Sequence, residues 1–130
     1  MSRILGRYSD AIYALLRFVA GFMFMFHGLQ KCFGALGGHK ADNHLLWIAG
    51  SIELVGGILI MIGLLASWAA FLASGMMAVA YFMVHQPQGT WPIQNQGELA
   101  VLYCFVFLYI AARGSGAYSV ARALNNPKLD

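Results

Sequence analysis

Four apolar segments constrain the fold of this chain more than any other feature of its sequence. They run over residues 11–29, 45–66, 68–85 and 97–112. Each approaches the roughly 20 residues that a helix needs to cross a hydrocarbon core of about 30 Å. A backbone in lipid must satisfy its own hydrogen bonds, and these segments lack the alternating pattern of barrel strands. The sequence therefore predicts an all-α membrane protein with a single transmembrane domain over residues 1–130.

The composition supports a membrane protein and excludes other classes. Only 10% of the residues are charged and 60% are hydrophobic, whereas soluble domains carry about 25% charged residues. The formal charge of +3 comes from basic residues scattered singly along the chain, which does not favour a nucleic-acid partner. The lipid bilayer is the expected partner. Short connections between the spans predict a four-transmembrane-helix, up-down-up-down bundle.

Basic residues outside the spans predict the orientation of the bundle. Five of them share the side of the two termini and two lie on the other side: Arg3, Arg7, Arg113, Arg122 and Lys128 against Lys31 and Lys40. Positive residues are enriched on the cytoplasmic side of membrane proteins. Both termini are therefore expected in the cytoplasm, with the first and third connections on the outer face.

Two charged residues lie inside predicted spans, Arg17 in the first and Glu53 in the second. A charge at the centre of a helix costs about 2.5–3.5 kcal/mol on insertion scales, so such residues usually face the bundle interior and pair. Counting 1.5 Å per residue from the ends of the spans places the two Cα atoms about 8 Å apart in depth. Three interpretations stay open: a structural ion pair, the lining of a polar pocket for a quinone or another small ligand, or no contact between the two.

Small residues surround Glu53 in the run GSIELVGG. Gly50 and Gly57 share its helix face at helical spacing, and small residues of this kind let a neighbouring backbone approach closely. The two cysteines, Cys32 and Cys104, show no CxxC spacing and are expected at different depths. Two separate thiols are therefore the expectation.

A second group of polar residues is expected at the outer rim of the bundle. It consists of His27, Lys31, His85, Trp91, Asn95 and Glu98. The uncharged loop between the last two spans predicts either a lid over a ligand headgroup or a rigid cap, and Glu98 also suits a helix N-terminus. His27 and His85 are the residues that a haem or metal ion would use, but no HxxxH or CxxCH spacing is present, so the sequence favours ordinary interfacial histidines.

The order of these motifs resembles that of the DoxX family. The resemblance covers residues 14–119 and rests on a basic residue early in the first span, the HGLQKCFG run after Gly21, AGSIELVGG, HQPQGTWPIQNQGE and RGSGAYS. It implies a small four-helix bacterial inner-membrane protein linked to thiol and sulfur redox chemistry. Some relatives look like subunits of a thiosulfate:quinone oxidoreductase, and a mycobacterial member associates with a sulfurtransferase and a superoxide dismutase. The matching positions are Arg17, His27, Lys31, Glu53 and His85, whereas the chain has no cysteine motif suited to dithiol exchange.

Residues and resemblance together predict an inner-membrane subunit associated with quinone-linked or thiol and sulfur redox chemistry. The sequence leaves the cofactor open: the polar pocket would take a quinone-like or another small ligand, haem is not favoured, and the partner would be a redox protein or a second copy of the chain. No catalytic residue is assigned. The alternatives are a non-catalytic scaffold or assembly factor and a small-solute carrier. The candidate ligand-binding residues are Arg17, His27, Lys31, Glu53, His85, Trp91, Asn95 and Glu98.

Overall fold

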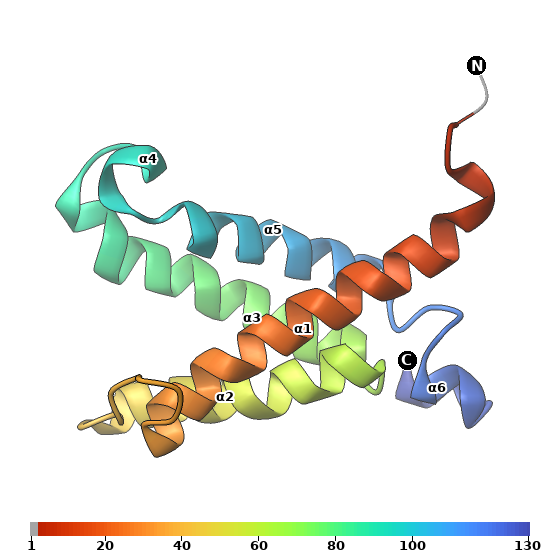
Figure 1. Ribbon diagram of the computed structural model, residues 1–130, viewed down its shortest axis with the longest axis horizontal. Helices are drawn as coiled ribbons and strands as arrows, with labels where there is room; N and C mark the ends of the chain where they lie inside the picture. Colours follow the sequence, from red (N-terminus) through yellow and green to blue (C-terminus); the bar gives the residue numbers. More distant parts are fainter. Residues whose placement is uncertain (1–2) are drawn as a thin grey trace.

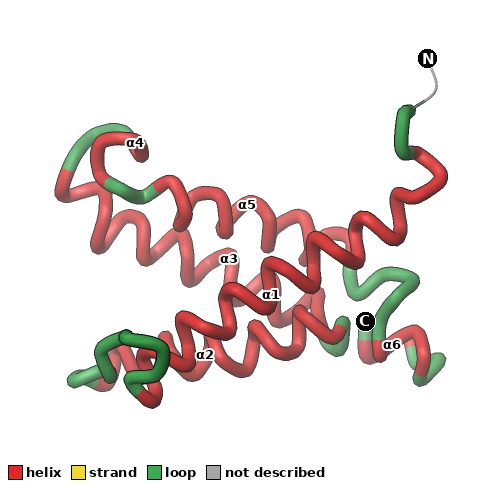
Figure 2. Tube along the Cα trace, viewed as in Figure 1, coloured by secondary structure: helices red, strands yellow, loops and turns green. Residues whose placement is uncertain are grey.

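Four helices make up most of the computed structural model, which describes residues 3–130 (Figure 1). They are α1 (Ser9–Phe33), α2 (His44–Ile62), α3 (Ala66–Ala80) and α5 (Glu98–Arg113). A π-helical turn, Tyr81–His85, and a 3-10 turn, Gln86–Gln88, continue α3, and the short helices are α4 (Pro92–Asn95) and α6 (Val120–Ala123). Single 3-10 turns, Gly6–Tyr8 and Pro127–Leu129, lie near the two ends. No strand occurs over residues 3–130 (Figure 2), so the predicted all-α class is confirmed.

Within residues 3–130, three helical stretches are long and apolar enough to cross a membrane. They are Gly6–Phe33, His44–Ile62 and Ala66–Gln88. The fourth predicted span coincides with α5, whose 16 residues reach about 24 Å at 1.5 Å per residue, short of a core of about 30 Å. Large apolar side chains such as Phe22, Phe71 and Phe105 are exposed on the outside of the helices, as contact with lipid requires. The chain is thus a helical membrane protein, and a fourth span stays a prediction.

The helices form two antiparallel pairs, α1 with α2 and α3 with α5 (Figure 1). Aromatic contacts join the pairs: the Phe24 ring of α1 lies 4.7 Å from the Phe107 ring and 5.6 Å from the Tyr103 ring of α5. The N-terminal end of α1, the turn between α2 and α3 and the C-terminus lie at one end of the molecule. We call this the terminal end. The opposite end holds the loop of residues 34–43 and α4.

Glycines let α1 and α2 pack with their backbones in close approach. A Cβ atom added at Gly28 would lie 2.3 Å from the backbone nitrogen of Leu54 and 2.7 Å from the Gly50 carbonyl oxygen. A Cβ atom at Gly57 would lie 2.8 Å from the Gly21 carbonyl oxygen. These separations are shorter than van der Waals contact, so only glycine fits. The expected close packing around Glu53 is therefore confirmed.

Replacing Gly28 with Ala is expected to lower the free energy of unfolding by about 3 kcal/mol, because overpacking against a rigid backbone costs about 1–3 kcal/mol and occasionally more. Gly56→Ala is the matched control, since nothing lies within 4 Å of a Cβ atom there, and we expect little change. Reversible unfolding in mixed detergent micelles measures both. Similar losses in the two variants would contradict the close approach of α1 and α2.

Candidate functional site

Arg17 does not pair with Glu53, so the interpretation as a structural ion pair is wrong and the interpretation without a contact between the two residues holds. Arg17 is 3% exposed, and its guanidinium donates to backbone carbonyls instead. Nε donates to Ile60 at 3.0 Å, and Nη2 donates to Tyr118 at 2.7 Å. Nη1 donates to the carbonyl of Ser115. Arg17 therefore joins the last turn of α2 to the segment that follows α5.

The distance along α2 explains why Arg17 and Glu53 stay apart. Seven residues separate Glu53 from Ile60, which is about 10 Å at 1.5 Å per residue. The last carbonyls of a helix have no partner within the helix and carry partial negative charge. Arg17 lies beside these carbonyls, where a cation is favoured. Its contacts give it a structural role at the terminal end.

The chain after α5 folds back as a cap over the terminal end, beside the turn between α2 and α3 (Figure 1). The backbone nitrogen of Leu65 donates to Leu129 at 2.7 Å, and that of Ala121 donates to Gly63 at 3.0 Å. The sequence did not predict these contacts. The one signal for them was the glycine-containing run RGSGAYS, in which Gly114 and Gly116 both have a φ of 81°, a conformation that favours glycine.

Lys31 is the partner of Glu53. The Lys31 ammonium lies 2.5 Å from Oε1 of Glu53, and the carboxylate side chain is only 3% exposed. The other carboxylate oxygen, Oε2, is buried and has no hydrogen-bond partner within residues 3–130. Buried polar atoms are usually paired. Glu53 Oε2 is thus a free acceptor, and it is the carboxylate oxygen among the buried side-chain atoms of residues 3–130 that lack a partner.

Two further polar side chains, Tyr103 and His27, contact each other within the helix bundle. The Tyr103 hydroxyl is also buried without a hydrogen-bond partner in the described part of the chain. The His27 ring stands edge-on to the Tyr103 ring, with centroids 6.3 Å apart. We call His27, Lys31, Glu53 and Tyr103 the Glu53 cluster. Its residues come from α1, α2 and α5. The sequence did not mark Tyr103 as a candidate ligand-binding residue, because its neighbours in the sequence are apolar.

Asn95 has a different role, at the end of the molecule that holds α4. It is 1% exposed, and its Nδ2 donates to the Gly89 carbonyl at 3.0 Å and to the Tyr81 hydroxyl at 3.2 Å. Its Oδ1 accepts from the Gly97 backbone nitrogen at 2.9 Å. His85 Nδ1 lies 3.1 Å from the Asn95 carbonyl oxygen. These contacts tie the loop to itself, as the rigid-cap interpretation expects.

The residues predicted at the outer rim do not form one contacting group within residues 3–130. No hydrogen bond, ion pair or ring contact over residues 3–130 joins His27 or Lys31 to the group of His85 and Asn95. Trp91 is 64% exposed, and Glu98 is exposed in the first turn of α5, where its charge suits the helix dipole.

The described residues offer no metal centre and no disulfide. No three side chains of His, Cys, Asp and Glu gather closely enough within residues 3–130 to hold a metal ion. Cys32 is buried and Cys104 half-buried, and both are free thiols, as expected from their spacing. The chemistry that the geometry offers is therefore hydrogen bonding at a buried carboxylate and a buried hydroxyl.

Comparison with known proteins gives a family and one close relative. The DoxX family model matches residues 12–86. A protein of Haemophilus influenzae (strain ATCC 51907 / DSM 11121 / KW20 / Rd), described as an uncharacterized protein, is 42% identical over 121 residues. The match covers 87% of this chain and 90% of the relative. No solved structure matches the chain.

Proposed function

Because this chain belongs to the DoxX family, we propose that it is an inner-membrane subunit that binds a quinone-like ligand at the Glu53 cluster. The single observation that carries the ligand site is the buried Glu53 Oε2, which lacks a hydrogen-bond partner. A buried acceptor without a partner costs about 1–3 kcal/mol, and more when it is charged. A ligand that donates a hydrogen bond to this oxygen recovers that free energy.

The chemistry of the cluster suits a quinone and its quinol. A quinol hydroxyl donates to Glu53 Oε2, and a quinone carbonyl accepts from the Tyr103 hydroxyl, which is likewise unpartnered. Polar groups inside a membrane bundle commonly mark ligand and proton paths.

The redox role depends on a partner in this proposal. Cys32 and Cys104 are separate free thiols, so the chain supplies no dithiol of its own, and electron transfer is assigned to a partner redox protein. The five-to-two division of basic residues supports cytoplasmic termini. In that orientation the Glu53 cluster lies nearer the outer face than Arg17.

Thermal unfolding of purified protein with a short-chain quinone tests the ligand site. A ligand at 100 times its Kd adds about 2.7 kcal/mol of apparent stability, so the wild type should melt at a higher temperature. Tyr103→Phe removes only a hydroxyl that has no partner in the described chain. It should leave the ligand-free melt unchanged and reduce the quinone-dependent shift. Tyr118→Phe, at an exposed position, is the matched control and should keep the full shift.

Two outcomes would count against the quinone site. One is a wild-type melt that no quinone moves, and the other is a full shift retained by Tyr103→Phe. The first result would favour the scaffold or assembly role, and the second would place quinone binding away from Tyr103.

A further inference from the structure

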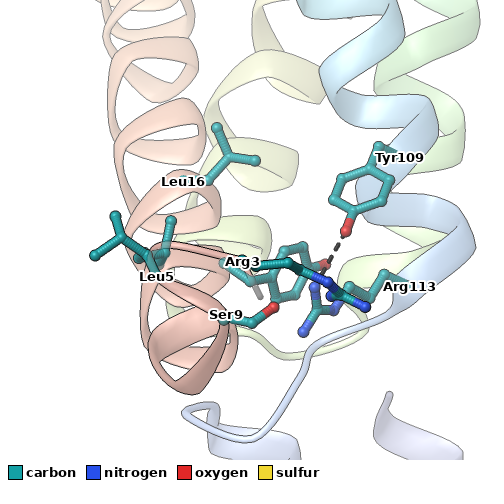
Figure 3. Close-up of a pocket in the computed structure, with 9 residues that line it drawn as sticks. Arg3, Leu5, Ser9, Leu16, Tyr109 and Arg113 are labelled. Atoms are coloured by element: carbon teal, nitrogen blue, oxygen red, sulfur yellow. Dashed lines mark hydrogen bonds between the residues drawn. The ribbon is translucent and has the colours of Figure 1, made fainter. Parts of the chain in front are cut away.

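A cavity of about 370 Å³ opens between the start of α1 and the end of α5 (Figure 3). Its polar lining comes from Arg3, Ser9, Tyr109 and Arg113, and its apolar lining includes Ile12 and Leu16. Figure 3 shows Arg3, Ser9 and Arg113 together at one level, with Leu16 farther along the helices. The two arginines thus lie together at the terminal end of a cavity that also has apolar walls, among them Leu5 and Leu16.

The charge of this cavity is positive. Two guanidiniums, of Arg3 and Arg113, line it, and no carboxylate does. Within residues 3–130, Arg113 forms an ion pair with Asp10 at 2.8 Å and Arg3 forms none. The Asp10 side chain is 65% exposed. Arg113 is also fixed by a hydrogen bond to the Tyr109 hydroxyl and by stacking over the Tyr13 ring. Because the Arg113 guanidinium is fixed in place beside that of Arg3, the cavity favours the binding of an anion.

An apolar groove continues from the cavity. Leu16 lines both the cavity and a groove of about 150 Å³ between α1 and α5. The other walls of the groove include Val19 and Met23 of α1 and Leu102, Tyr103 and Val106 of α5, and no polar atom is exposed in it. A positive pocket that leads directly into an apolar groove matches a molecule with an anionic head and a hydrocarbon tail.

We propose that the cavity binds the headgroup of an anionic phospholipid, with one acyl chain lying in the groove between α1 and α5. The phosphate interacts with Arg3 and Arg113, and the chain packs against Leu16 and its neighbours. Basic pockets between membrane helices bind anionic headgroups in this way. A free inorganic anion would leave the groove unused, and a zwitterionic lipid would bring a cationic group beside the guanidiniums.

The test compares lipid retention by the full chain purified from membranes and reconstituted in nanodiscs. The discs contain phosphatidylcholine alone or an equal mixture with phosphatidylglycerol, and native mass spectrometry counts the lipids that stay bound. The wild type should retain phosphatidylglycerol in preference and melt at a higher temperature in the mixture. Arg3→Gln should weaken this retention about fivefold, as expected for losing one basic residue at a membrane surface.

Arg7→Gln is the matched control. It removes the same charge only four residues away, but the Arg7 guanidinium stacks over the Tyr8 ring at 4.6 Å and does not line the cavity. Its retention should equal that of the wild type. Three results would overturn the proposal: no preference for phosphatidylglycerol in the wild type, equal losses in the two variants, or equal protection of the melt by inorganic phosphate.

Discussion

Replacing Arg17 with Ala is expected to lower the free energy of unfolding by about 3–5 kcal/mol. The guanidinium donates to three carbonyls that have come out of water, and hydrogen bonds to charged groups contribute about 1.5–3 kcal/mol each, without strict additivity. Arg122→Ala is the control, because Arg122 is exposed. Denaturant unfolding in micelles measures the loss, and limited proteolysis should show residues 114–130 becoming sensitive in Arg17→Ala alone. A stable variant with a protected C-terminal cap would contradict the role given to Arg17.

The same variant tests whether Arg17 and Glu53 act independently. Their contacts share no partner, and their levels on α2 differ by about 10 Å. Substitutions at such separated sites add to within about 0.5 kcal/mol. The effects of Arg17→Ala and Glu53→Gln should therefore add in the double variant. A larger coupling energy would restore the direct pair that the sequence suggests and the structure does not contain.

The end of α1 shows how far hydropathy predicts this fold. Apolar residues place the first span over residues 11–29, and a helix is there, but α1 continues to Phe33 and ends only where Gly34 takes a left-handed conformation, with a φ of 65°. Hydropathy marks the end of the apolar run, and polar residues continue the helix beyond it. Lys31 was therefore assigned to the connection, and it was not considered as a partner of Glu53.

Contacts between distant parts of the chain were beyond prediction from the sequence for a different reason. Arg17 meets Ser115 across 98 residues, and neither residue carries a local signal for the other. The sequence identified Asn95 as a polar residue in an uncharged loop. Whether its amide bonds to a ligand or to the loop itself depends on how the backbone of the loop folds, which the sequence does not show. The apolar segments of the sequence thus predicted the helices. The partners of the buried polar groups could be identified only in the folded chain.

Replacing Lys31 with Met is expected to lower the free energy of unfolding by about 3–5 kcal/mol, the range for a buried ion pair that has lost one member. The change leaves both oxygens of a Glu53 carboxylate that is only 3% exposed without a hydrogen-bond partner in the described chain. Lys40→Met is the control, because Lys40 is an exposed lysine in the loop of residues 34–43. It should unfold like the wild type in the same detergent titration.

The two members of the pair should not be equivalent. The Lys31 side chain is 32% exposed against 3% for Glu53, so water can solvate the ammonium when its partner is lost but cannot reach the carboxylate. Glu53→Gln should therefore cost less than Lys31→Met, and the double variant should recover much of the Lys31→Met loss, because no charge is then buried alone. Equal losses, or a double variant as unstable as the sum, would mean that Glu53 is accessible to water. A solvated carboxylate would have no need of a ligand to satisfy Oε2, so this comparison also tests the premise of the quinone site.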